Sequence, residues 1–120
     1  MLKGKKHLPT YNDGIVGIYA EKERKTDFNA KRNVTKLEDM DFVVGLAFQE
    51  CSKRTQDLEF AEQSGFSLSY KVKTHYRPNV QVKHKAVING YLYEVSYIDK
   101  AGAEMYLYLE GVRKLDTEQD

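Results

Sequence analysis

The dipeptide Asn89-Gly90, which lies between two short apolar runs, constrains the fold of this chain more than any other feature. Asn-Gly in this setting is the strongest short-range signal for a β-hairpin, because both central residues of the tight turn need positive φ. The flanking runs therefore predict strands over 85–88 and 91–98. A second turn over 99–102 leads into an apolar run over 104–112, so we expect the last three strands to form an antiparallel meander.

Further strands are expected upstream of the meander. The runs 15–20 and 40–50 are rich in β-branched and aromatic residues, and Gly45 marks an expected bulge in the second run. Residues 66–73 alternate between an apolar face and a polar face, the latter made of Ser67, Ser69, Lys71 and Lys73. A turn is expected at Arg77-Pro78-Asn79, with Pro at its second position.

One segment predicts a helix. Residues 55–64 are rich in Gln, Glu, Leu and Ala, which favour helices. Thr55 is the expected N-cap, and Gly65 stands where a glycine commonly ends a helix. We expect Leu58 and Ala61 to face inward.

The chain of 120 residues has the size of one domain. We expect a polar N-terminal arm over 1–14, one barrel-like domain over 15–112, and a charged C-terminal tail over 113–120. The domain contains a long polar loop over 21–39, and loops of this length are usually functional or disordered. The predicted fold is mainly β: a small antiparallel barrel or sandwich of five to six strands, with one short helix and this long loop.

Charge and cysteine content limit the functions and the cellular compartment that we expect for this chain. Nineteen basic residues face eighteen acidic ones, for a net charge of +1. Dedicated duplex-binding proteins carry a basic excess, because phosphate contacts supply much of their affinity. Cys51 is the single cysteine, which excludes an internal disulfide and indicates a reducing compartment, the cytoplasm. No apolar run reaches the roughly 18 residues that a membrane span needs, so we expect no membrane partner.

Residues that carry chemistry are scattered. The three histidines lack metal-ligand spacing, and the acidic residues, including Asp57, stand in loop-like or helix-surface contexts where solvated side chains are expected. Cys51 has no histidine nearby in the sequence and is interpreted as a half-buried structural cysteine. No glycine-rich phosphate loop is present. We therefore expect no catalytic residue, no metal and no cofactor.

Two groups of residues suggest binding. The long loop interleaves basic residues with one aromatic, a pattern that suits single-stranded nucleic acid or ordering against a protein neighbour: Arg24, Lys25, Phe28, Lys31 and Arg32. A second group places tyrosines on shared strand faces, with Tyr91, Tyr93 and Tyr97 on one and Tyr106 and Tyr108 on the next. Tyrosine is favoured at interfaces, but cross-strand packing explains such a pattern equally well.

The order of the expected elements, together with three segments, resembles the head–tail joining, or head-closure, proteins of long-tailed bacteriophages. The segments are 71–78 (KVKTHYRP), 87–95 (VINGYLYEV) and 105–109 (MYLYL), and Phe60-Ala61-Glu62-Gln63 is similar to the family's helical stretch. The resemblance covers roughly residues 15–112. It implies a small barrel that assembles as a ring of six copies in the virion neck.

The resemblance also implies the partners and the site. The ring would dock below the portal and adaptor proteins, close the DNA channel after packaging and receive the tail, while DNA passes without tight binding. Assembly would take place in the host cytoplasm, and the long loop would face the channel. On exposure and loop position, the expected interface residues are Arg24, Lys25, Phe28, Lys31, Arg32, Tyr76, Arg77, Tyr106 and Tyr108.

Two other functions remain open at this point. A small-barrel nucleic-acid-binding protein would use the basic residues of the long loop and would show salt-sensitive affinity. Another neck or tail-completion component of similar architecture is the second alternative. For ring assembly, exposed strand edges and long loops are the expected contact elements, through strand addition or ordering on contact.

Overall fold

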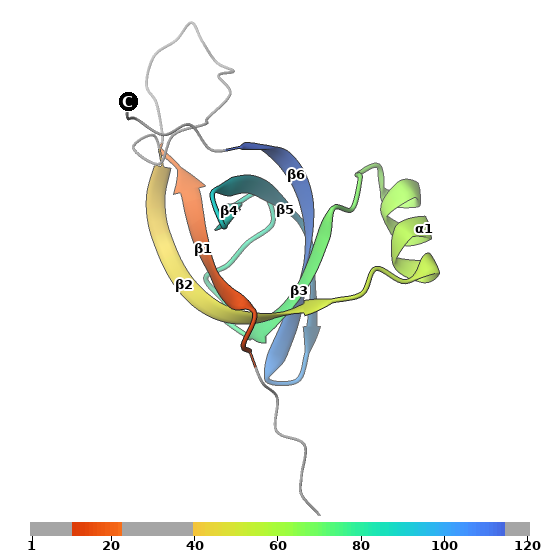
Figure 1. Cartoon of the computed structure of the whole chain (residues 1–120), viewed down its shortest axis with the longest axis horizontal. Coiled ribbons are helices and arrows are strands. Elements are labelled where there is room, and N and C mark those ends of the chain that lie inside the picture. Colours follow the sequence, from red (N-terminus) through yellow and green to blue (C-terminus); the bar gives the residue numbers. More distant parts are fainter. Residues whose placement is uncertain (1–10, 23–39, 115–120) are drawn as a thin grey trace, which may run out of the picture.

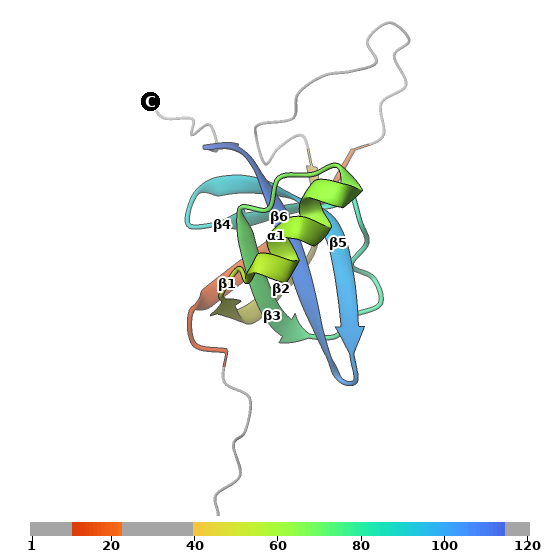
Figure 2. The ribbon, with the colours of Figure 1, turned by 90° about the vertical axis from the view of Figure 1, so that its right-hand side faces the viewer.

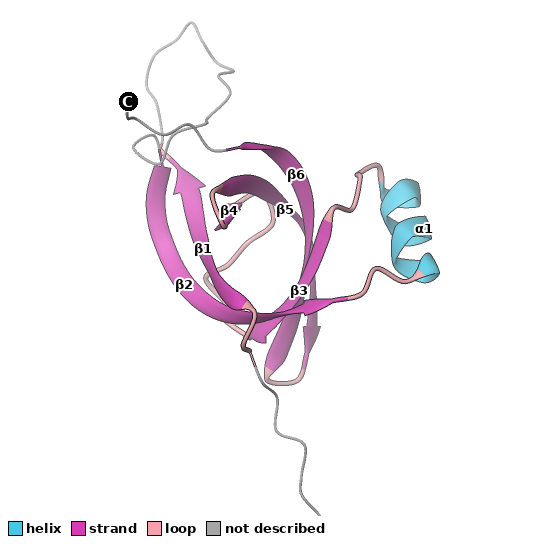
Figure 3. Cartoon of the chain, in the orientation of Figure 1, coloured by secondary structure: helices cyan, strands magenta, loops and turns pink. Residues whose placement is uncertain are grey.

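The computed structural model describes residues 11–22 and 40–114. This part of the chain is mainly β, with six strands and one helix (Figure 3). In chain order the elements are β1 (Gly14–Glu21), β2 (Met40–Cys51), α1 (Thr55–Ser64), β3 (Tyr70–His75), β4 (Lys85–Ile88), β5 (Tyr91–Ala101) and β6 (Glu104–Lys114). The expected long loop falls almost wholly on residues 23–39, which lie outside the described residues.

The six strands close into an antiparallel barrel in the order β1-β2-β3-β6-β5-β4 (Figure 1). Closure comes from β1, which pairs with β2 on one side and with β4 on the other, at Gly17↔Val87, Ile18↔Ala86 and Tyr19↔Lys85. The predicted small antiparallel fold with one short helix is confirmed, and the barrel is the form that it takes. The predicted meander is also confirmed, since β4, β5 and β6 are neighbours in chain order.

Inward-facing side chains from all six strands fill the barrel. Phe48 is fully buried and packs its ring edge-to-face on Tyr70, with 6.1 Å between ring centroids. Burial of apolar surface at roughly 25 cal/mol per Å² is the main stabilising contribution here. The buried cluster consists of Val16, Ile18, Leu46, Phe48, Val72, Val80, Ala86, Ile88, Val95, Met105, Leu107 and Leu109.

The bulge in β2 is at Val43. The sequence predicted it at Gly45, and that prediction is wrong. Ile18 pairs with Val44 and Tyr19 with Phe42, which leaves Val43 as the extra residue. Val43 and Val44 both pack against the buried cluster. A regular strand cannot direct two consecutive side chains to the same face, so the bulge allows both valines to face inward.

The predicted hairpin is confirmed, with φ of 51° at Asn89 and 80° at Gly90. The turn at 99–102 was placed too early. The ladder between β5 and β6 continues through Lys100↔Met105 and Ala101↔Glu104, and the reversal falls at 102–103. The turn at Arg77 is confirmed by the hydrogen bond that the N–H of Val80 donates to the carbonyl of Arg77.

Helix α1 lies on the outside of the barrel, across β3, β6 and β5 (Figure 2). Its C-terminal end follows the prediction, because Gly65 has φ of 87° and the N–H of Phe66 reaches the carbonyl of Ala61. Its start differs: the N-cap is Arg54, and Asp57 in the first turn accepts the Arg54 N–H. Ala61 is buried as expected, whereas Leu58 is 45% exposed, which contradicts the prediction.

The last residues of the expected N-terminal arm are attached to the barrel. A carboxylate oxygen of Asp13 accepts the N–H of Glu50 at 2.7 Å, and the Tyr11 hydroxyl donates to Glu104. The Tyr11 ring also packs on His75, with 4.6 Å between centroids. Residues 1–10 of the expected arm lie outside the described residues, as do residues 115–120 of the expected tail.

Replacement of Gly90 by Ala is expected to destabilise the fold by about 1 kcal/mol, because its φ of 80° places a Cβ in a strained conformation. Gly45→Ala is the matched control, since its Cβ would meet only ordinary contacts at 3.6 and 3.7 Å and its φ is not in the left-handed region. Urea unfolding of both variants measures the difference. Equal stability of Gly90→Ala and Gly45→Ala would contradict the assigned turn.

Candidate functional site

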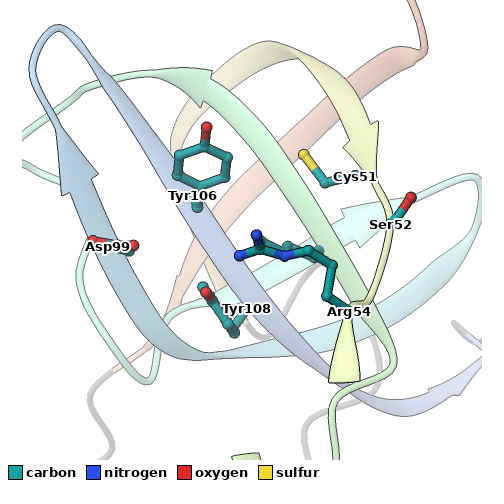
Figure 4. Close-up of a pocket in the computed structure, with 7 residues that line it drawn as sticks. Cys51, Ser52, Arg54, Asp99, Tyr106 and Tyr108 are labelled. Atoms are coloured by element: carbon teal, nitrogen blue, oxygen red, sulfur yellow. The ribbon is translucent and has the colours of Figure 1, made fainter. Parts of the chain in front are cut away.

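A cleft of about 320 Å³ opens between the start of α1 and the outer face of the barrel. The sheet register explains how its residues meet. Lys71 on β3 pairs with Cys51 on β2 and with Tyr108 on β6, while Tyr106 pairs with Asp99 on β5. Figure 4 shows the lining residues, which are Cys51, Ser52, Arg54, Lys71, Asp99, Tyr106 and Tyr108.

A buried ion pair forms the wall behind the cleft. The ammonium of Lys71 lies 3.0 Å from a carboxylate oxygen of Asp57, and the two side chains are 7% and 4% exposed. Asp57 was expected to be solvated, and this expectation is wrong. Lys71 was expected on the polar face of its strand. Lys71 does face outward from the barrel, but α1 covers this part of the outer surface and carries Asp57 onto it.

Asp57 is held by several donors. One carboxylate oxygen accepts hydrogen bonds from the Arg54 N–H at 3.0 Å and from Arg54 Nε at 3.4 Å, besides the bond from Lys71. The other oxygen accepts the Tyr108 hydroxyl at 3.3 Å. Burial acts to raise the pKa of Asp57, but the hydrogen bonds from Arg54 and Lys71 outweigh it and lower the pKa to about 2. The carboxylate is therefore ionised wherever the protein is folded near neutral pH.

Lys71 is also kept in its charged form. Burial acts to lower its pKa, but the bond to Asp57 and the nearby Tyr108 outweigh burial, so the net shift of the pKa is upward. Its ammonium lies 5.2 Å from the ring centroids of both Tyr106 and Tyr108. Cation–π contact of this kind compensates part of the lost hydration.

Aromatic rings continue the contact between helix and barrel. Phe60 of α1 packs on Tyr97 and Tyr108, at centroid distances of 4.7 and 5.9 Å. Tyr106 and Tyr108 share one face, as predicted, and both pack against the cluster beneath the helix. For Tyr108, which is 6% exposed, packing is therefore the explanation that holds.

The other predicted tyrosine face does not exist. Tyr93 packs against the barrel interior, whereas Tyr97 lies under the helix. A register shift between Val95 and Tyr97 breaks the alternation that would have placed the two tyrosines together. Such a shift has no clear signal in the sequence.

The remaining predicted interface residues are not part of this cleft. The five loop residues Arg24, Lys25, Phe28, Lys31 and Arg32 lie outside the described residues. Tyr76 and Arg77 follow β3, away from the helix, where Lys100 lies 4.8 Å above the Tyr76 ring and Arg77 donates to the Tyr76 carbonyl. Tyr76 is partly buried against the barrel core, and Arg77 is exposed.

The chemistry of the cleft favours binding over covalent catalysis. A reactive cysteine or lysine needs a lowered pKa, so that the nucleophilic form is populated. Burial raises the pKa of the Cys51 thiol, and the pKa of Lys71 is also raised. No group of three or more His, Cys, Asp or Glu side chains that could hold a metal occurs within residues 11–22 and 40–114.

A second surface was missed by the sequence analysis. Ile15 and Phe42 on the outer face of β1 and β2 are both 62% exposed. Gly17 and Gly45 pair between them, and a Cβ on Gly45 would touch both apolar side chains. Exposure of two large apolar residues on a shared face is typical of a protein contact. The alternation of 15–20 does contain the signal, because Ile15 and Ile18 cannot face the same side.

No family model matches this sequence, and no curated protein matches it. Within the described residues, no helix has the length and apolar character needed to cross a membrane.

Removal of the Asp57 carboxylate by Asp57→Ala is expected to cost about 3–5 kcal/mol of stability, since it leaves the Lys71 ammonium buried without its counter-ion. The double variant Asp57→Ala/Lys71→Met should recover much of this loss. Lys73→Met is the matched control on the same strand, because its 3.9 Å pair with Glu104 is partly exposed and is worth at most about 1 kcal/mol. If urea unfolding shows similar losses for Asp57→Ala and Lys73→Met, the ion pair does not have this role.

The ion pair also predicts a pH dependence. The pKa of Asp57 is lowered from 3.8 to about 2, so its stabilising effect is complete above pH 3.8 and is lost as the pH falls through 2. The shift corresponds to about 2 kcal/mol. As the pH falls from about 4 to about 2, the unfolding free energy of the wild type should therefore decrease relative to that of Asp57→Ala/Lys71→Met. A difference that stays constant over this interval would contradict the assignment.

Proposed function

We propose that this protein is a structural component of the neck of a long-tailed bacteriophage, which docks under the portal and adaptor ring, closes the DNA channel after packaging and joins head to tail. The proposal starts from the resemblance of segments 71–78, 87–95 and 105–109 to head-closure proteins. The small barrel and its external helix are the architecture that the resemblance implies. The observation that carries the proposal furthest is the exposure of the apolar side chains Ile15 and Phe42 on the outer face of β1 and β2.

Barrel closure restricts how copies of this chain associate. Every described strand has hydrogen-bonded neighbours on both sides, but several of the ladders are short. β2 pairs with β3 only at residues 49–51, and β1 pairs with β4 only at residues 17–19. Strand addition is therefore restricted to stretches beyond these ladders, such as residues 40–48 of β2. Other contacts with neighbours would use a face of the barrel or a segment outside the strands.

The outer face of β1 and β2 is suited to such a contact. Its central residues, Ile15, Gly17, Phe42, Gly45 and Ala47, are uncharged. The Tyr19 ring packs edge-on against Phe42, with 5.4 Å between centroids, and lies over Gly17, where a Cβ would come within 3.1 Å of the ring. These contacts hold the aromatic side chains close to the sheet and keep the face flat. Helix α1 lies on the opposite side of the barrel (Figure 1).

An uncharged face supports assembly into a ring. Closed rings with more than two copies use heterologous interfaces, in which one surface meets a different surface of the next copy. The apolar face supplies one of the two surfaces, and the rest of the barrel is available for the other. The net charge of +1 also fits a channel component that blocks DNA without gripping it, because a strongly basic channel would retain DNA by counterion release.

The proposal gives the protein no catalytic step and no cofactor. Closure of the channel is mechanical, and docking depends on burial of apolar surface. Localisation follows from the role: host cytoplasm during assembly, and the virion neck afterwards.

DNA-filled, tailless phage heads that carry portal and adaptor test the proposal. The wild-type protein should sediment with the heads and protect their DNA from nuclease. Phe42→Ser is expected to reduce head binding about tenfold or more, because it removes apolar contact area from the interface centre. Tyr91→Ser is the matched control, since Tyr91 is 48% exposed but lies outside this face.

Three outcomes would count against the proposal. If the protein ignores heads and shifts free nucleic acid, the small-barrel nucleic-acid-binding function is the better one. If it caps isolated tails instead, it belongs to the tail side of the joint. If Tyr91→Ser loses binding and Phe42→Ser keeps it, the β1–β2 face is not the contact.

A further inference from the structure

We propose that the cleft beneath α1 binds a carboxylate from an acidic segment of a partner protein. This inference deepens the proposed function, because it gives the chemistry of one contact with a neck partner, and it rests on that function only for the partner's identity. The hydrogen-bond donors that line the cleft and the charges around it favour such a ligand.

Arg54 presents donors to the cleft in a fixed orientation. Its Nε binds Asp57 at 3.4 Å, which restrains the side chain at one point, and its backbone N–H binds the same carboxylate oxygen. The side chain is nevertheless 62% exposed. Figure 4 shows the guanidinium extended over the cleft toward Tyr106 and Tyr108. The terminal nitrogens of a guanidinium held in this way form the planar fork that matches a carboxylate.

Lys71 adds a second positive charge at the inner wall. An ammonium has three N–H donors, and those of Lys71 have two acceptors within the described residues, the Asp57 carboxylate at 3.0 Å and the Tyr108 hydroxyl. Two acceptors leave one of the three donors for a ligand. The rings of Tyr106 and Tyr108, with centroids 5.2 Å from the ammonium, also attract the cation. The Lys71 side chain lines the cleft, so an incoming acceptor meets a buried and pre-oriented ammonium.

The charges near the cleft leave a positive surplus on one wall. Arg54 and Lys71 contribute two positive charges, and Asp57 contributes one negative charge, so the three together carry one positive charge. Asp99 lies on the opposite wall (Figure 4). A single anionic group is therefore favoured on the Arg54 side and is repelled from the Asp99 side. The hydroxyls of Ser52 and Tyr106 provide further polar atoms in the lining.

The same features favour a carboxylate over a nucleic acid. Single-stranded nucleic acid binds through bases stacked on exposed aromatic rings and through a continuous basic groove. Tyr108 is 6% exposed, and both Tyr106 and Tyr108 pack against the helix cluster, so their faces are not free for bases. Asp99 interrupts the positive charge across the cleft. A volume of about 320 Å³ accommodates an acidic side chain with its stem.

The test uses the isotope-labelled full chain and a capped hexaglutamate peptide, followed by NMR. The peptide should shift the Arg54 Nε–H signal and the amide signals of residues 51–54 and 106–108, with saturation by about 5 mM. Capped hexaglutamine should leave them unchanged. An oligothymidylate of matched length tests the nucleic-acid alternative, and equal or tighter binding of this oligomer at the same signals would overturn the proposal.

Variants make the test specific. Arg54→Gln should weaken peptide binding about tenfold, since it removes a charge-assisted bidentate contact. The backbone cap to Asp57 is retained in this variant, and thermal unfolding checks its fold. Asp99→Asn should strengthen binding about threefold, because it removes a like charge from the opposite wall. The gain in Asp99→Asn does not depend on whether Arg54→Gln folds well.

Lys53→Gln is the matched control, because Lys53 is an exposed neighbour whose ammonium binds the Ser69 carbonyl and does not line the cleft. If Lys53→Gln weakens binding as much as Arg54→Gln, or if Asp99→Asn has no effect, the attraction is general and the cleft is not the site. The result is separable from the proposed function. If the peptide binds but the protein does not close heads, the cleft is still a carboxylate site and the proposed function is wrong. If the protein closes heads but does not bind the peptide, only the carboxylate site is wrong.

Discussion

The buried pair between Asp57 and Lys71 joins the two parts of this fold. Without the helix, Lys71 would be an ordinary lysine on the outer surface of a barrel. Without Lys71, the buried carboxylate of Asp57 would keep only its bonds from Arg54 and Tyr108. The pair places the start of α1 next to β3, and the packing of Phe60 on Tyr97 and Tyr108 sets the rest of the helix. The orientation of Arg54 depends in turn on Asp57, which accepts hydrogen bonds from its backbone N–H and its Nε.

The barrel and the helix divide the surface into two different regions. On the side of β3, β5 and β6, the helix covers the sheet and leaves a small polar cleft at its edge. On the side of β1 and β2, no described element covers the sheet, and Ile15 and Phe42 stay exposed. An apolar face supplies area for a broad contact, while a charged cleft selects a particular group. The two regions are thus suited to different kinds of neighbour.

What could be predicted depended on how far apart the interacting residues are in the sequence. The Asn89-Gly90 hairpin and the helix end at Gly65 are set by local backbone conformation, and both were found from the sequence. The environment of Lys71 could not be predicted. Alternation shows which side of the sheet a residue faces, but not whether another element covers that side. The same holds for Asp57, which reads as a solvated helix residue until the helix is placed. Tyr97 was misplaced because a bulge at one residue reverses the alternation beyond it.

The ladders of the barrel differ greatly in length. β5 and β6 pair over ten positions, and β1 and β2 over eight, whereas β1 meets β4 at three positions and β2 meets β3 at three. β4 and β5 also pair at only four positions, so three short ladders complete the ring. The apolar face lies on β1 and β2, whereas the charged cleft is lined from the end of β2, the start of α1, and β3, β5 and β6. Mechanical load between neighbours bound at these two sites would be shared by the short ladders and by the interior side chains packed between them.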